Sequence, residues 1–238
     1  RNNVSKIDLI THKYEVDQNL LLALMGIETN FGNYLGKMDI VSSLATLSFD
    51  KRRSEFFTSE LITLLKLVDS KIVEPNTLFG SWAGAFGNFQ FMPSTIKNYA
   101  VDHDKDGKIN LKKTEDSFAS AANYLSKLGW NSSQPCFYKV NLSENIPEDY
   151  LNISAKKIHS IKKVNYLKKY ILDSNFLKNY DNLNAAIITP DAEIVENPNK
   201  LNPAYIIFDN YRLILKWNRS LRFALAVCKL KNNFKNEI

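Results

Sequence analysis

The residue best suited to acid–base chemistry is Glu28, in the stretch LLALMGIETNFG at residues 21–32. On a helix, Leu21, Met25 and Glu28 share one face, so the carboxyl group lies along an apolar stripe. Removal from water penalises the charged carboxylate and raises its pKa, so the group can hold a proton near neutral pH. Such a glutamic acid can act as a general acid. Alternatively, Glu28 turns to solvent at a frayed helix end or pairs with an arginine.

A second candidate stretch, GSWAGAFGNFQFMPST at residues 80–95, combines small residues with aromatic ones. Its glycines and alanines allow the backbone to approach a bulky group closely. Ser81 offers a hydroxyl group, and the amide of Gln90 both donates and accepts hydrogen bonds. Flat rings of the kind that stack on sugars are Trp82, Phe86, Phe89 and Phe91. The composition fits a ligand cleft and tight helix packing equally well.

An acidic loop, DHDKDGKINLKKTED at residues 102–116, has the spacing of a cation site. Asp102, Asp104 and Asp106 take positions 1, 3 and 5 of an EF-hand-type loop. Gly107 takes position 6, where the chain must turn sharply. Position 12, however, is Lys113 rather than the bidentate glutamate of a standard loop.

A loop lengthened by three residues would bring Asp116 to the closing position, and Lys108 would contribute its backbone carbonyl. Oxygen ligands alone indicate a hard cation, which we expect to be Ca²⁺ in a structural role. The alternative is a charged surface turn without an ion.

The helix that carries Glu28 should begin after Asp17, a plausible N-cap, and continue to about Thr29. Gly32 is then a natural left-handed stop. Apolar residues at helical spacing predict a helix at residues 54–70, and the Ala-rich stretch at residues 117–128 predicts another.

Pro93 fits the first turn of another helix. Gly129 is a natural end for the helix at residues 117–128. The first 130 residues are therefore expected to be mainly helical.

The composition changes after residues 134–135, and the segment that follows is richer in Asn and Lys. Apolar spacing over residues 158–171 predicts an amphipathic helix with paired lysines on its polar side. Residues 185–199 alternate weakly, as in a strand or hairpin. Residues 204–218 resemble a strand with a turn at residues 209–210, and residues 221–230 resemble a final helix.

The bulk composition indicates a packed globular protein, with 45% hydrophobic and 24% charged residues. The net charge of +6 favours acidic partners, although a lysine-rich solvated surface explains it equally well. Nucleic-acid binding rests on this charge alone, because no recognition motif accompanies it. Cys136 and Cys228 have no metal-like spacing, and the sequence leaves open whether they are bridged or free.

The longest apolar run, residues 20–27, is too short to cross a bilayer. The chain begins at Arg1, which we interpret as a mature or trimmed fragment. Any signal peptide or lipid anchor would then already be absent.

Several blocks of sequence together resemble the B-type lytic murein transglycosylases, soluble or membrane-bound. The blocks are GIETNFG, LATLSF, RRSEFF, GSWAGAFGNFQFMPSTIKNYAVDHDKDGKINL, ANYLSKLGW and YRLILKWNRSLRFALAVCKL. They occur in the order of that family, nearly continuously over residues 14–130 and again over residues 204–230.

The resemblance implies an α+β fold that is predominantly helical, with a lysozyme-like core and a deep glycan groove. The catalytic core, with its EF-hand-like calcium loop at residues 102–116, is expected at residues 1–135. A smaller mixed subdomain, either β or a helical replacement, would be inserted at residues 136–205. Residues 206–238 would return to the core.

The resemblance also assigns roles to individual residues, with Glu28 as the single catalytic acid and base. The residues that it places in contact with substrate are Arg52, Arg53, Ser81, Gln90, Tyr124, Trp217, Asn218 and Phe223. The Ca²⁺ ligands that it implies are Asp102, Asp104, Asp106, Lys108 (by its carbonyl) and Asp116. Trp217 and Phe223 stand where the family usually has tyrosine, and so they lack a phenolic hydroxyl.

The activity implied is cleavage of the β-1,4 bond between N-acetylmuramic acid and N-acetylglucosamine in peptidoglycan, with formation of a 1,6-anhydro end. No cofactor is expected for catalysis. Two alternatives are a catalytically silent peptidoglycan-binding or scaffold module and a hydrolytic muramidase.

The expected partners are peptidoglycan glycan strands and cell-wall remodelling proteins, and the chain is expected to be a monomer that binds no nucleic acid. The implied location is the bacterial periplasm or cell envelope. Membrane attachment is expected only through a lipid or N-terminal anchor outside this chain.

Overall fold

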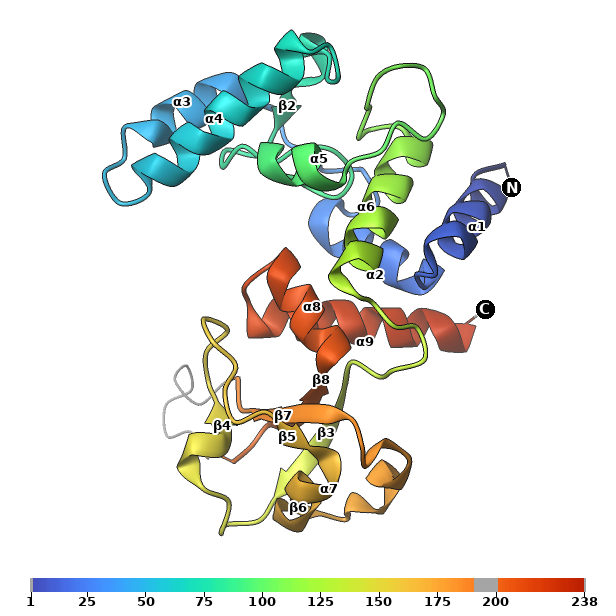
Figure 1. The fold of residues 1–238 in the computed structure, drawn as a ribbon, viewed down its shortest axis with the longest axis vertical. Coiled ribbons are helices and arrows are strands. Elements are labelled where there is room, and N and C mark those ends of the chain that lie inside the picture. The colour runs from blue at the N-terminus through green and yellow to red at the C-terminus, as the bar shows by residue number, and fades with distance from the viewer. Residues whose placement is uncertain (1, 191–200, 238) are drawn as a thin grey trace. The chain divides into compact units, whose positions relative to one another are not determined.

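The computed structural model describes residues 2–190 and 201–237, which fall into two compact units (Figure 1). The first unit comprises the chain up to Gly129 together with the C-terminal end from Phe234, and the second comprises Trp130–Asn233. Residues 206–233 therefore lie in the second unit. The expectation that residues 206–238 return to the catalytic core stays a prediction.

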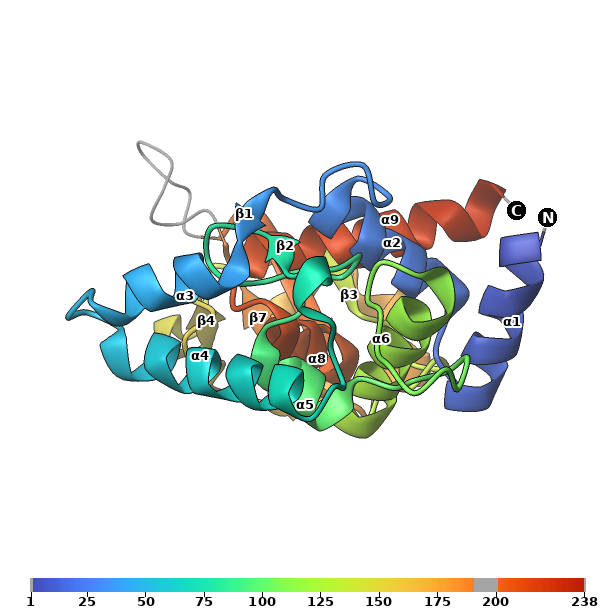
Figure 2. The same cartoon turned by 90° about the horizontal axis from the view of Figure 1, so that it is seen from above.

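The first unit is built mainly of helices. These are α1 (Asn2–Tyr14), α2 (Gln18–Thr29), α3 (Ile40–Ser48), α4 (Ser54–Asp69), α5 (Pro93–Tyr99) and α6 (Thr114–Leu128). Helices α3 and α4 form a hairpin, seen from two sides in Figure 1 and Figure 2. A short antiparallel ribbon pairs β1 (Met38–Asp39) with β2 (Phe79–Gly80).

Buried apolar side chains hold this unit together, and α1 packs on α6. The buried face of α2 presents Leu20, Leu21 and Leu24 to the core. A buried carboxylate also joins α4 to α5. Both oxygens of Glu60 accept hydrogen bonds from Ser94, one from its backbone N–H (2.8 Å) and one from its hydroxyl (2.6 Å).

The expected helices of the first unit are confirmed, although α6 begins at Thr114 rather than residue 117 and the two ends of α2 differ from the prediction. Asp17 takes the N-cap position of α2, but its side chain makes no capping hydrogen bond. The left-handed residue that ends α2 is Asn30 rather than Gly32. Asparagine tolerates this conformation well, and the N–H of Asn30 bonds to the carbonyl of Gly26.

The second unit is organised around a mixed sheet in the order β4-β7-β8-β3-β6, with β5 also paired to β7. Among the strands that the structure describes, the β4–β7 pair alone is parallel. The strands are β3 (Phe137–Leu142), β4 (Leu151–Asn152), β5 (Lys162–Lys163), β6 (Ile171–Leu172), β7 (Asn184–Ile188) and β8 (Ala204–Phe208). Its helices are α7 (Val164–Leu167), α8 (Asp209–Trp217) and α9 (Leu221–Glu237), the last of which continues past residue 233.

The central strands β7 and β8 are almost wholly buried, as their continuous apolar sequences require. A disulfide joins Cys136, just before β3, to Cys228 in α9. This bond settles the cysteine pairing that the sequence left open.

The single helix predicted over residues 158–171 is wrong in its first part, because helical turns occur only at Val164–Leu167 and Lys168–Tyr170. This segment contains β5, the single turn α7 and β6. The apolar residues Val164, Leu167 and Ile171 do have helical spacing, but they pack into the core beneath the sheet. Pairing of Lys162 and Lys163 with β7 overrides the local preference for helix.

The turn predicted at residues 209–210 is also wrong, because α8 begins there. The buried amide of Asn210 donates to the carbonyls of Asn131 (2.7 Å) and Gln134 (2.9 Å), which fixes the start of the helix. In the predicted strand or hairpin at residues 185–199, β7 accounts for the beginning, and residues 191–199 lie outside the described residues.

A predominantly helical α+β fold with a mixed sheet is thus confirmed. Across residues 2–190 and 201–237, every helix is too short or too polar to cross a membrane.

Candidate functional site

Glu28 lies in the last turn of α2 and is half-buried. On the face that it shares, Leu21 is buried and Met25 is half-buried, so the carboxyl group lies at the border between core and solvent. The helix axis is set by the buried leucines of α2, which pack into the first unit. The core therefore determines where the acid group stands.

The end of α2 is held by Thr29, a residue that sequence reasoning missed. Its buried hydroxyl donates to the carbonyls of Asn88 (2.9 Å) and Met25 (3.1 Å) and accepts from the N–H of Gly32 (3.1 Å). The bond to Asn88 ties the backbone next to Glu28 to the loop at residues 81–92, and the bonds to Met25 and Gly32 hold the last turn of α2 and the residues just beyond it. A threonine next to the glutamate was the only sequence signal for this role.

Asn88 continues the connection and was also missed. Its buried amide donates to the hydroxyl of Ser117 on α6 (3.0 Å) and to the carbonyl of Lys112 (3.3 Å). Its backbone N–H donates to the carbonyl of Leu111 (2.8 Å). The loop that holds Glu28 in place is therefore itself bonded to the acidic loop and to α6.

A cavity of about 470 Å³ adjoins the end of α2. Its lining consists of residues 32–37 together with Ser81 and Gln90. Cavities of several hundred Å³ are typical of small-ligand sites. The structure thus brings two of the predicted substrate residues, Ser81 and Gln90, together with the segment that follows Glu28 in the chain.

The cavity wall depends on close backbone contacts. Gln90 has a left-handed backbone (φ 50°), and its amide donates to the carbonyls of Gly87 (3.0 Å) and Leu35 (3.3 Å). Gly36 has φ 83°, and a Cβ there would lie 2.1 Å from the carbonyl oxygen of Gly80. Glycine is therefore required where the two sides of the wall meet.

Ser81 is positioned by its neighbour in the same loop. Its hydroxyl oxygen accepts a hydrogen bond from the backbone N–H of Ala85 (3.1 Å), so the hydroxyl hydrogen is not used in this bond.

The aromatic residues of the loop divide into two groups. Trp82 is 69% exposed, whereas Phe86, Phe89 and Phe91 are each 3% exposed. The three phenylalanines therefore form core, which decides in favour of tight packing at these rings, one of the two alternatives that the composition left open. Trp82 alone of the four presents its ring to solvent.

Tyr124, the third predicted cleft residue of this unit, does not line the cavity. Its ring stacks on Tyr99 with centroids 4.3 Å apart and meets Phe91 edge-on at 5.9 Å. Burial raises the pKa of Tyr124 above its usual value. Its phenol therefore stays protonated and able to donate.

Arg52 and Arg53 are exposed just before α4. The guanidinium of Arg53 lies 4.5 Å from the ring centroid of Phe56 and 5.0 Å from that of Phe57. These cation–π contacts give the side chain a defined position while its charge remains accessible.

The other three predicted substrate residues belong to the second unit. Trp217 is the last residue of α8, Asn218 is its C-cap, and Phe223 lies in the first turn of α9. Each has its place at the junction between these two helices.

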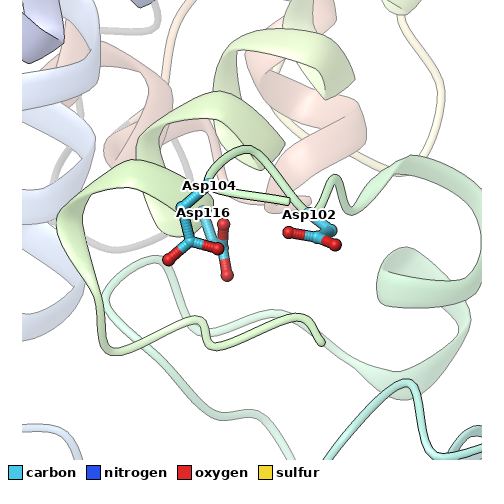
Figure 3. A group of neighbouring side chains, drawn as sticks. All are labelled: Asp102, Asp104 and Asp116. Carbon is cyan, nitrogen blue, oxygen red and sulfur yellow. The ribbon is translucent and has the colours of Figure 1, made fainter. Parts of the chain in front are cut away.

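In the acidic loop, Asp102, Asp104 and Asp116 bring one carboxylate oxygen each to within 4.8 Å of one another (Figure 3). Asp116 is buried at the start of α6 and accepts the N–H groups of His103 and Asn110, both at 2.8 Å. Burial raises the pKa of Asp116. Asp102 Oδ1 is also buried and has no hydrogen-bond partner among the described residues.

Asp106 lies apart from this group and pairs with Lys113. The Lys113 ammonium contacts carboxylate oxygens of both Asp106 (2.8 Å) and Asp104 (3.0 Å), and these bonds lower the pKa of each aspartate. The side chain of Lys108 pairs with Glu74. A buried carboxylate oxygen without a partner and three converging carboxylates suit a hard cation, whereas Lys113 competes for two of the carboxylates.

A family model described as the transglycosylase SLT domain matches residues 1–232. The chain is 45% identical over 118 residues to membrane-bound lytic murein transglycosylase B from Escherichia coli (strain K12), a match that covers 49% of this chain and 33% of that protein. The matched stretch therefore spans about a third of the length of this relative.

Two solved structures are similar over nearly the whole chain. SltB3 from Pseudomonas aeruginosa, in complex with NAG-anhNAM-pentapeptide, has a TM-score of 0.82 and 32% identity, covering 98% of this chain and 60% of that one. Lytic transglycosylase Slt35 from Escherichia coli, in complex with calcium, has a TM-score of 0.72 and 29% identity, covering 97% and 73%.

Proposed function

Because the chain belongs to the transglycosylase SLT domain family, we propose that it is a peptidoglycan lytic transglycosylase with Glu28 as its single acid and base. It cleaves the β-1,4 bond between N-acetylmuramic acid and N-acetylglucosamine and leaves a 1,6-anhydro end. The observation that carries this proposal is the position of Glu28 in the last turn of α2, four residues before Gly32, where the lining of the 470 Å³ cavity begins. The related SltB3, in complex with an anhydro sugar peptide, supports it.

The reaction requires only one carboxyl group. Glu28 first donates its proton to the glycosidic oxygen, and the bond from that oxygen to C1 breaks. The resulting carboxylate then takes the proton of the sugar's own C6 hydroxyl while that oxygen bonds to C1. Since the nucleophile is tethered in the substrate, proximity replaces the second carboxylate that most glycosidases use. No water is consumed.

The other site residues bind and orient the glycan in this proposal. Ser81, Gln90 and Tyr124 offer hydrogen bonds to the sugar next to Glu28. Arg52 and Arg53 bind lactyl or peptide carboxylates through charge-assisted bonds. Trp217, Asn218 and Phe223 contribute further contacts, and two of them do so without the hydroxyl of a tyrosine.

We further propose that the acidic loop is an EF-hand-like Ca²⁺ site formed by Asp102, Asp104, Asp106, the Lys108 carbonyl and Asp116. The unpartnered oxygen of Asp102 and the nearby carboxylates of Asp104 and Asp116 support it, as does the calcium complex of the related Slt35. The ion would stabilise the loop, and the bonds from Asn88 to residues 111, 112 and 117 place that loop next to the support of Glu28. No catalytic step uses the ion.

The proposed location is the bacterial cell envelope, and more narrowly the periplasm. The disulfide between Cys136 and Cys228 fits an oxidising compartment of this kind. The proposed partners are peptidoglycan glycan strands and, in the cell, wall-remodelling proteins. The proposed state is a monomer that binds no nucleic acid.

The test is product analysis by mass spectrometry after incubation with purified sacculi. We expect anhydro-muropeptides from the wild type, and we expect Glu28→Gln to reduce their release by about 10³-fold, since it removes the titrating proton but keeps the shape. The matched control is Glu55→Gln, at an exposed glutamate of α4, which should retain wild-type turnover.

Three outcomes contradict the proposal in different ways. Products heavier by one water identify a hydrolytic muramidase. Binding to sacculi without any product identifies a silent scaffold module. Full turnover by Glu28→Gln shows that another residue is the acid.

A further inference from the structure

The positive charge of the chain belongs to one unit. Residues 1–129 contain 15 Lys or Arg and 15 Asp or Glu, whereas residues 130–233 contain 15 and 9. The net charge of +6 is therefore carried by the second unit. The proposed chemistry of Glu28, in the first unit, does not account for this excess.

Much of the excess comes from residues 150–172, which we call the lysine-rich segment. It contains no Asp or Glu, and its basic residues are Lys156, Lys157, Lys162, Lys163, Lys168 and Lys169. All of these except Lys168 are exposed. Within the second unit the segment includes β5, α7 and β6, which lie away from α8 (Figure 1).

Among residues 2–190 and 201–237, the acidic groups that flank the segment in sequence or are bonded to its lysines are few, and they include Glu148 just before it. Asp149 precedes it and Asp173 follows it, and Asp181 is bonded to Lys168 (2.7 Å). Lys163 donates to the backbone carbonyl of Asn182 (2.8 Å), a neutral partner. The remaining lysines therefore present a field of one sign.

Tyrosine rings hold two of these lysines in place. The ammonium of Lys169 lies 4.2 Å from the ring centroid of Tyr166 and 4.8 Å from that of Tyr170, and the ammonium of Lys162 lies 5.9 Å from Tyr166. Tyr150 donates a hydrogen bond to the hydroxyl of Tyr166 (3.2 Å). Side chains that are already ordered lose less entropy when they bind a ligand.

The same segment exposes large apolar side chains between the lysines. These are Ile153, Ile161, Tyr166 and Leu172. A soluble polyanion would satisfy the lysines but would leave these apolar groups in water. The surface of an anionic bilayer satisfies both, because phosphates meet the ammonium groups while aliphatic and phenolic side chains enter the headgroup region.

We infer that the lysine-rich segment is a docking surface for the anionic phospholipid headgroups of a membrane. This contact is additional to any anchor outside the chain, and it is electrostatic, so salt weakens it. It does not depend on the proposed catalytic function, which resides in the first unit.

The experiment is co-sedimentation of the purified chain with vesicles of phosphatidylcholine alone or of phosphatidylcholine mixed with phosphatidylglycerol. We expect binding only to the anionic vesicles, with a loss at high salt. The double variant Lys162→Gln/Lys169→Gln should bind about 25-fold more weakly, since each lysine near an anionic surface contributes about fivefold. The matched control Lys66→Gln/Lys97→Gln makes the same charge change at exposed lysines of α4 and α5 and should bind like wild type.

Three results would overturn the inference. The first is equal binding to neutral and anionic vesicles, or none to either. The second is equal loss in the two double variants, which would indicate net charge rather than a surface. The third is loss of muropeptide release from membrane-free sacculi in Lys162→Gln/Lys169→Gln, which would assign the surface to glycan. Glu28→Gln should bind vesicles normally, so the membrane proposal and the catalytic proposal fail separately.

Discussion

At the scale of single residues, the proposed acid depends on its neighbour. Glu28 is at the end of a helix, where side chains and backbone normally fray. Thr29 prevents this by bonding to Asn88 across the chain and to Gly32 just beyond the helix. We regard Thr29 as a positioning residue, because it acts through the backbone that carries Glu28.

Replacing this hydroxyl group tests the idea. Thr29→Val keeps the shape but leaves the Asn88 carbonyl and the Gly32 N–H unpaired, which should lower the free energy of unfolding by about 1–3 kcal/mol. We expect Thr29→Val to lower kcat for muropeptide release while KM changes little. Thr29→Ser should restore both kcat and the free energy of unfolding. Thermal melting and sacculus kinetics measure the two effects. An unchanged kcat in the folded valine variant would leave Thr29 a purely structural role.

At the scale of elements, α3 illustrates a helix end stabilised by one carboxylate. Asp39 accepts the backbone N–H of Ser42 (2.7 Å), and this bond lowers the pKa of Asp39 below its ordinary 3.8. Asp39→Ala should cost about 1 kcal/mol of unfolding free energy at pH 7.

The pH dependence of this cap has a definite sign. Because the folded pKa lies below the unfolded one, the stabilisation is complete above the unfolded value of 3.8 and is lost as the pH falls through the folded value. Urea unfolding of wild type and Asp39→Ala should therefore converge at acidic pH. Asp69→Ala, at an exposed aspartate that ends α4, is the control and should show no such convergence.

The acidic loop is an element whose stability should depend on an ion. Millimolar Ca²⁺ should raise the melting temperature relative to EDTA, because the ion binds the folded state. Asp102→Asn should abolish the shift.

Lys113 should weaken this ion binding, since its ammonium occupies carboxylates of Asp104 and Asp106. We expect Lys113→Gln to bind Ca²⁺ more tightly in calorimetry, with Lys105→Gln, in the same loop but without these pairs, as the control. Equal affinities would show that the lysine turns away at no cost when the ion enters.

At the scale of the whole molecule, the disulfide restrains the second unit. Cys136 and Cys228 are 92 residues apart, and closing a loop of this length in the unfolded chain is worth about 4.6 kcal/mol in the chain-entropy model. Reduction should therefore lower the melting temperature of the wild type. The variant Cys136→Ala/Cys228→Ala should melt at the lower temperature and be insensitive to reductant. A wild type that melts unchanged under full reduction would contradict this account.

Features determined by neighbouring residues could be predicted from the sequence alone. The helices α4, α5 and α6 follow from apolar spacing, Pro93 and Gly129, because helix formation and capping act over a few residues. The same holds for Glu28 on α2 and for the sharp turn at Gly107.

Features that join distant residues required the fold. Thr29 and Asn88 are 59 positions apart, and nothing in either local sequence specifies their bond. Phe86, Phe89 and Phe91 point inward while Trp82 is exposed, because the packing of the loop, and not its composition, determines which rings reach the core. In residues 158–171, pairing with β7 outweighed a helical pattern. Local periodicity records only which side of an element is apolar, whereas the partner that covers it is chosen by contacts far along the chain.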